Sequence, residues 1–110
     1  LSLVQGGTIM TNPLLAGLPP VHPGEFLRED VLPGTGLTKV EVAQRLGISR
    51  TQLYGILDGR KAVTAQMALR LGRFFGDGPQ VWLTMQAAYD IAVAEAEVAG
   101  DLAAIEPIAA

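Results

Sequence analysis

The chain has 110 residues, a formal charge of −3, no cysteine and a single histidine, His22. A chain of this length forms one domain that buries an apolar core without disulfides or metal ions, and the lack of cysteine excludes thiolate nucleophiles, iron–sulfur clusters and cysteine-type zinc sites. No apolar run approaches the roughly 20 residues that cross a bilayer, and no basic segment precedes an apolar stretch at the start, so we expect a cytoplasmic protein without metal or cofactor.

Residues 1–20 are predicted to be a flexible N-terminal arm. They contain three glycines and three prolines and show little polar periodicity. Met10 looks like a natural start, which leaves an upstream start or an added sequence as origins of residues 1–9.

A first helix is expected to begin at His22 and Pro23 and to end near Pro33, since proline is favoured in a first turn and cannot continue a helix. Glu25 and Glu29 lie one turn apart, a spacing that suits acid–base chemistry, but without a metal partner or a second histidine they read as a solvated acidic face. We likewise interpret His22 as a structural residue. The apolar side of this helix is predicted to contain Phe26, Leu27, Val31 and Leu32.

Two short helices with their own start signals follow in immediate succession within residues 38–59. Thr38 precedes Glu41 by three residues, and Ser49 precedes Gln52 by the same distance. Each pair fits the capping box, in which two side chains satisfy two unpaired amides at a helix start.

Glycines end both helices, because Gly47 and Gly59 can adopt the left-handed conformation that follows a helix C-terminus. The connection consists of Gly47 and Ile48 only, which forces a steep crossing with Ile48 between the helices, and this is helix-turn-helix geometry. The apolar sides are predicted to be Val40, Val42, Ala43 and Leu46 in the first helix and Leu53, Ile56 and Leu57 in the second.

The outward side of the second helix is equipped to contact DNA. In helix-turn-helix proteins this helix enters the major groove. Arg50 can make a bidentate contact to guanine and Gln52 to adenine, while Thr51 adds a methyl and a hydroxyl group. An ordinary helical hairpin is the alternative. The candidate DNA-binding residues are Gln44, Ser49, Arg50, Thr51, Gln52, Tyr54, Gly55, Arg60, Lys61 and Thr64.

The net negative charge hides an uneven distribution. Residues 39–73 hold seven of the eight basic residues and two acids, a local charge of +5, whereas the remainder of the chain carries −8. Phosphate binding depends on local charge, because charges beyond about 8 Å are screened at physiological salt. We expect a basic patch on an acidic body, with cations scattered over solvated faces as the alternative.

Two more helices are predicted, one from Thr64 to Gly76 and a longer one from Gln80 to about Ala99. The first half of the last helix carries Trp82 and completes the core.

The second half of that helix is too rich in alanine to be buried by so small a body. Its small residues could let two helices approach closely in a dimer, or the half could be a solvated helix; they are Ala92, Val93, Ala96 and Ala99. The predicted division is residues 21–99 as the DNA-binding domain and 100–110 as an acidic tail.

The second helix and its flanks resemble the Cro/cI-like (XRE) helix-turn-helix family in Gln44, Gly47, the Ser49-Arg50 pair and Leu57-Asp58-Gly59. Over residues 21–97 the chain is similar to the HigA-type antitoxins of type II toxin–antitoxin operons. The matching segments are His22-Pro23-Gly24-Glu25, Gly59-Arg60, Thr64 with Met67-Ala68-Leu69-Arg70, and Trp82-Leu83 with Gln86 and Tyr89-Asp90.

The resemblance implies an all-α, five-helix, lambda-repressor-like domain that binds an inverted-repeat operator as a homodimer and represses its own transcription. It also implies that the protein neutralises a HigB-like toxin, a ribosome-dependent mRNA endonuclease of the RelE type. One departure is Tyr54-Gly55 inside the second helix of the motif, where the family usually has a polar, better helix-forming pair. Glycine there costs about 1 kcal/mol relative to alanine. This glycine permits a closer approach of the helix to DNA or weakens DNA recognition by the helix.

Two other functions are alternatives to this one. An XRE-type regulator without a toxin differs only in lacking a toxin-like reading frame beside its gene. An enzyme would need a nucleophile–base pair, a ligand cluster or a glycine-rich phosphate loop after a strand, and the sequence offers none of these. We therefore expect no catalytic residues.

Overall fold

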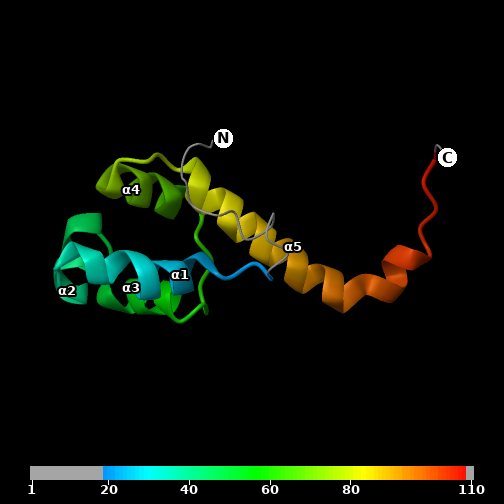
Figure 1. Cartoon of the computed structure of the whole chain (residues 1–110), viewed down its shortest axis with the longest axis horizontal. Coiled ribbons are helices and arrows are strands. Elements are labelled where there is room, and N and C mark those ends of the chain that lie inside the picture. Colours follow the sequence, from blue (N-terminus) through cyan, green and yellow to red (C-terminus); the bar gives the residue numbers. More distant parts are fainter. Residues whose placement is uncertain (1–18, 109–110) are drawn as a thin grey trace.

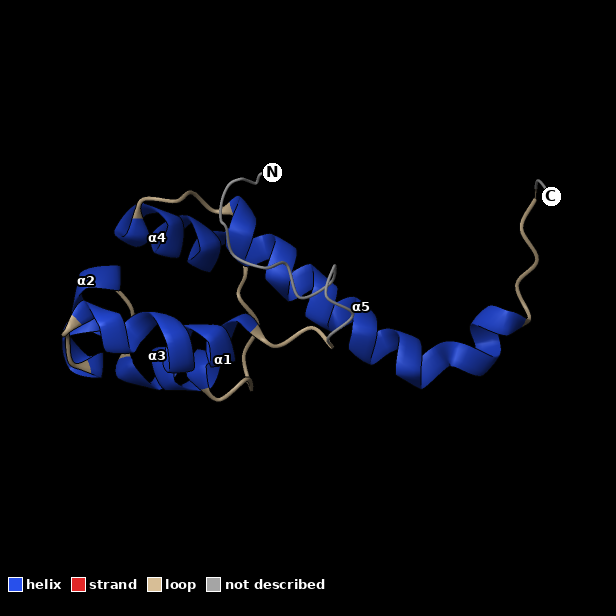
Figure 2. Cartoon of the chain, viewed as in Figure 1, coloured by secondary structure: helices blue, strands red, loops and turns tan. Residues whose placement is uncertain are grey.

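The computed structural model describes residues 19–108, and over this range it contains five α-helices and no strand (Figures 1 and 2). The all-α class predicted from the sequence is confirmed. Most of the predicted N-terminal arm, with the start at Met10, lies outside the described residues. The helices are α1 (Pro23–Phe26), α2 (Lys39–Leu46), α3 (Arg50–Leu57), α4 (Ala65–Phe75) and α5 (Gln80–Ala103).

The predicted first helix is not one regular α-helix. After α1 the chain continues as a π-helical turn, η1 (Leu27–Val31), and a 3-10 turn, η2 (Leu32–Thr35). The amide of Leu32 bonds to the carbonyl of Leu27, five residues earlier, and Pro33, which lacks an N–H, cannot resume the regular α-helical pattern after it. The helical segment nevertheless ends close to Pro33, as predicted, because the 3-10 turn finishes at Thr35 and Gly36 follows with a left-handed φ of 71°.

Local signals set the boundaries of α2 and α3. Thr38 and Glu41 form the full capping box, with the Thr38 hydroxyl accepting from the Glu41 amide at 3.1 Å and the Glu41 carboxylate accepting from the Thr38 amide at 2.8 Å. At the start of α3 the Ser49 hydroxyl accepts from the Gln52 amide at 3.0 Å. Gln52 does not bond back to Ser49, so the second predicted box is only half formed.

The turn between α2 and α3 has the predicted geometry, with Gly47 at a φ of 74° and Ile48 half-buried against the core. Val40 is an exception among the predicted core residues, since it is 39% exposed. The buried core is formed by Leu27, Leu32, Val42, Ala43, Leu46, Leu53, Ile56, Leu57, Val63, Met67, Ala68, Leu71 and Trp82.

Helix α5 has an inner and an outer half. Trp82 is buried in the inner half, with ring centroids of Phe26 and Phe75 at 6.1 and 5.8 Å. The outer half leaves the helical body, as Figure 1 shows, and the helix continues to Ala103, beyond the predicted end, with a kink at Val98. Within residues 19–108, no helix is long and apolar enough to span a membrane.

His22 connects three segments of the body. Its Nδ1 atom accepts a hydrogen bond from the Gly24 amide at 2.9 Å and so caps α1, and its ring meets that of Tyr89 on α5 edge to face at 5.1 Å. The ring also lies 3.8 Å from the position that a Cβ atom at Gly59 would occupy. Burial lowers the pKa of His22 below its ordinary value of 6.5, although the negative charge of Asp90 acts in the opposite direction.

The lowered pKa of His22 makes stability depend on pH. The unfolded chain binds the proton more readily than the folded chain, so the free energy of unfolding should be highest above pH 6.5 and should fall as the pH is lowered below it. His22→Asn keeps a capping oxygen but does not titrate, and its unfolding free energy should vary less with pH. Urea unfolding monitored by Trp82 fluorescence measures the free energy of unfolding of the wild type and of the variant at each pH. An equal dependence of this free energy on pH in the two proteins would contradict the expectation.

Candidate nucleic-acid interface

The exposed side of α3 carries four polar or aromatic residues, which we call the reading face: Arg50, Thr51, Gln52 and Tyr54. The opposite side of the helix is buried in the core. Lys39, at the start of α2, places its ammonium nitrogen 5.9 Å from the centre of the Tyr54 ring, a cation–π distance. Residues from both helices of the motif therefore share one surface.

Gly55, predicted to lie on this outward side, is buried. The aliphatic stem of Lys61 covers it, and its carbonyl accepts the amides of Arg60 and Lys61 at 2.9 and 3.0 Å. The prediction failed because the covering residue comes from the loop after α3, which a helical projection of α3 does not include.

Three other predicted residues lie at helix starts or on α2, and all are exposed. The hydroxyl of Ser49 caps α3, and the hydroxyl of Thr64 caps α4 by accepting from the Met67 amide at 3.2 Å. A hydroxyl that accepts in this way keeps its own proton for donation, for example to a phosphate oxygen. Gln44 projects from α2.

The loop between α3 and α4 is fixed at both ends by side chains from other segments. Nη1 of Arg28 donates to the Leu57 carbonyl at the end of α3 at 2.8 Å. On α5, Oε1 of Gln86 accepts from the buried Val63 amide at 2.7 Å, and Nε2 of the same side chain donates to Asp90 at 2.9 Å. The loop that carries Arg60, Lys61 and Thr64 therefore has a defined position.

The sequence-based site prediction missed Arg28 and Gln86 as supports of this loop. Arg28 is the one basic residue outside the window 39–73. Gln86 is a polar residue within the otherwise apolar stripe of the inner half of α5, which was a signal that it has a buried partner.

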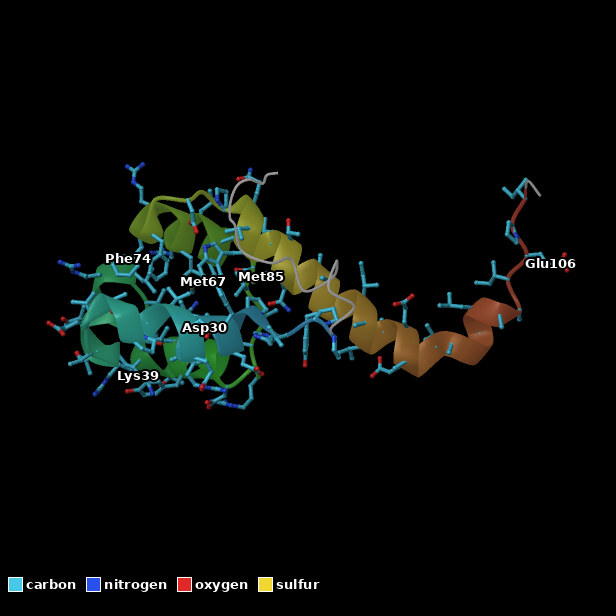
Figure 3. All side chains as sticks on the ribbon, in the orientation of Figure 1. Asp30, Lys39, Met67, Phe74, Met85 and Glu106 are labelled. Carbon is cyan, nitrogen blue, oxygen red and sulfur yellow. The ribbon has the colours of Figure 1, made fainter. Side chains whose placement is uncertain are left out.

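The cations of the predicted basic patch are divided between two surfaces. Arg60 pairs with Asp58 at 3.1 Å near the reading face. Arg45, Arg70 and Arg73 instead line a groove of about 450 Å³ with Leu46 and Phe74. Figure 3 shows Phe74 between α4 and α2, where it lines this groove, and Lys39 on the lower side of the helical body.

Arg70 has a structural role, since its Nη1 atom donates to the Leu46 carbonyl at 2.8 Å and so caps α2. Within the part of the chain that the structure describes, no three acidic or histidine side chains gather in a way that could hold a metal ion.

Comparison with known proteins finds helix-turn-helix proteins by sequence and by structure. A family model described as a helix-turn-helix domain matches residues 25–81. Virulence-associated protein I of Dichelobacter nodosus is 44% identical over 78 residues, covering 71% of this chain and 72% of that protein. Antitoxin HigA-1 of Vibrio cholerae is 32% identical over 72 residues, covering 66% and 68%. The structure of Pseudomonas aeruginosa antitoxin HigA with the higBA promoter superposes with a TM-score of 0.76, at 33% identity, over 81% of this chain and 98% of that one.

The buried bond between Gln86 and Val63 should contribute to stability. Gln86→Leu removes the acceptor and leaves the Val63 amide unsatisfied, which should lower the free energy of unfolding by about 1–3 kcal/mol. Asp90→Ala removes only an exposed partner of the same side chain and should cost less than about 0.5 kcal/mol. Urea unfolding compares the two variants, and equal losses would show that the buried amide is not the important partner.

Proposed function

The chain belongs to the helix-turn-helix family of HigA-type antitoxins, and on that premise we propose that it represses its own operon and neutralises a HigB-like mRNA-endonuclease toxin. The observation that carries the DNA-binding part is the reading face, four exposed residues in the first half of a helix that is capped at its start and buried on its other side.

Base recognition is assigned to the start of α3. Arg50 and Gln52 carry the two side-chain types that pair bidentately with guanine and adenine, and Thr51 can contact a thymine methyl group. All three are exposed, and within the described residues Arg50 has no carboxylate partner. Their side chains are therefore available to base edges once α3 enters the major groove.

Phosphate contacts are assigned to the residues around the reading face. Ser49 and Thr64 lie at helix starts, where hydroxyl and backbone donors suit an anion. Gln44, Arg60 and Lys61 add an exposed amide and two exposed cations. These contacts orient the protein on the duplex and give most of the salt-dependent affinity.

A homodimer is the proposed binding unit, because one reading helix covers only a few base pairs and an inverted repeat presents two major grooves about 34 Å apart. The outer half of α5 supports this proposal. It leaves the body and carries large apolar residues that are about 40–60% exposed, namely Ile91, Val93, Val98 and Leu102. Exposed apolar surface of this kind marks a contact with another protein.

Arg50→Ala should weaken operator binding by about 1–3 kcal/mol and relax the preference for one base pair. Lys61→Ala should weaken binding to all sequences alike and lower the slope of log affinity against log salt by about one. Arg73→Ala removes a cation of the α2–α4 groove and serves as the control, with affinity unchanged. Fluorescence anisotropy on operator and scrambled duplexes, over a salt series, checks all three; equal effects of Arg50→Ala on both duplexes would contradict base reading.

Ile91→Glu should convert the dimer to a monomer, because it places a charge among the exposed apolar residues of the outer half of α5. We expect a dissociation constant raised at least tenfold, which corresponds to about 1.4 kcal/mol. Glu97→Gln, an exposed change on the same half of the helix that removes no apolar side chain, should leave the dimer intact. Sedimentation with and without operator DNA measures this, and a wild-type monomer even on the operator would exclude the dimer.

The toxin arm of the proposal has a separate test. We expect a toxin-like reading frame beside the gene, and co-expression of its product with this protein should rescue growth and allow the two proteins to co-purify. Operator binding without rescue would favour the alternative, an XRE-type regulator that has no toxin partner.

A further inference from the structure

Lys61 is held against α3 by its backbone and by its side chain. A Cβ atom added at Gly55 would lie 2.9 Å from Cδ and 3.0 Å from Cγ of Lys61, closer than the roughly 3.5–4.0 Å at which carbon atoms pack. The Gly55 carbonyl also accepts the Lys61 amide at 3.0 Å. The absence of a side chain at Gly55 is therefore what lets the Lys61 stem lie on the helix backbone.

This contact places a cation beside the reading face. Gly55 follows Thr51 by one helical turn, so the two residues are neighbours on the surface of α3. Cε of Lys61 lies 3.2 Å from the position that a Cβ at Gly55 would occupy, and the ammonium nitrogen is bonded to Cε. Lys61 as a whole is exposed, so the ammonium group remains accessible.

We propose that Gly55 is a positioning residue, which fixes the stem of Lys61 so that its ammonium group meets a backbone phosphate next to the bases contacted by Thr51 and Gln52. This inference rests on the proposed operator binding. Holding the stem in place reduces the conformational entropy that a lysine loses on binding, so the phosphate contact gains affinity. It also accounts for a residue of poor helix propensity in the middle of a reading helix.

Close approach of DNA to Gly55 itself would be another reason for a glycine there. The contact with Lys61 disfavours that reason, because the space in front of Gly55 is already filled by the lysine stem.

A double-mutant cycle on operator affinity tests the role of Gly55. Gly55→Ala and Lys61→Ala should each weaken binding about three- to tenfold, and the double variant should bind no more weakly than Lys61→Ala alone. Arg60→Ala is the matched control: this neighbouring cation pairs with Asp58, so its effect should multiply with that of Gly55→Ala. Multiplicative effects of Gly55→Ala and Lys61→Ala would overturn the proposal.

Two measurements without DNA separate this role from folding and from operator binding. The thermal midpoint of Gly55→Ala should equal or exceed that of wild type, because alanine is the better helix former; a clear decrease would assign Gly55 a purely structural role and overturn the proposal.

In the wild-type protein, NMR should detect NOEs between the Gly55 Hα atoms and the Lys61 methylenes, and the absence of these NOEs would overturn the proposal regardless of DNA binding. NOEs in a chain that does not bind its operator would overturn the proposed function and this role together.

Discussion

The hydrogen bond from the Val63 amide to the side chain of Gln86 is the interaction on which the geometry of the interface depends most. It joins the loop that follows α3 to the inner half of α5, and both groups are buried. An unpaired amide at this place would be costly, so the loop has one favoured position. Arg28 fixes the other end of the same segment through the Leu57 carbonyl. Together these bonds hold Arg60 and Lys61 at a set distance from the reading face.

The starts and ends of α2, α3 and α4 could be predicted from the sequence because the responsible contacts are short in range. Thr38 and Glu41 are three residues apart, and Gly47 ends α2 through its own backbone conformation. The all-helical class and the helix-turn-helix motif follow from such signals. The interruption of the first helix was missed, because a pattern of apolar residues does not distinguish an α-helical turn from a π-helical one.

The candidate site also has features that the sequence predicted and features that it did not. Exposure of Arg50 and Gln52 follows from their place on α3 opposite its apolar side, and the sequence predicted it. Burial of Gly55 and the loop-fixing role of Gln86 depend on contacts with Lys61 and Val63, which belong to other segments. Helical periodicity describes one helix at a time, so it does not predict contacts between a helix and a loop.

The charge distribution gives the molecule a strong electric dipole. No basic residue follows Arg73, whereas six acids do, and α5 carries most of them away from the helical body along the longest dimension of 52 Å. In the field of a polyanionic duplex such a molecule experiences a torque that turns its cationic helical body toward the DNA and the outer half of α5 away from it. Productive encounters should therefore be more frequent than random collision allows, and this advantage should fade as ionic strength rises.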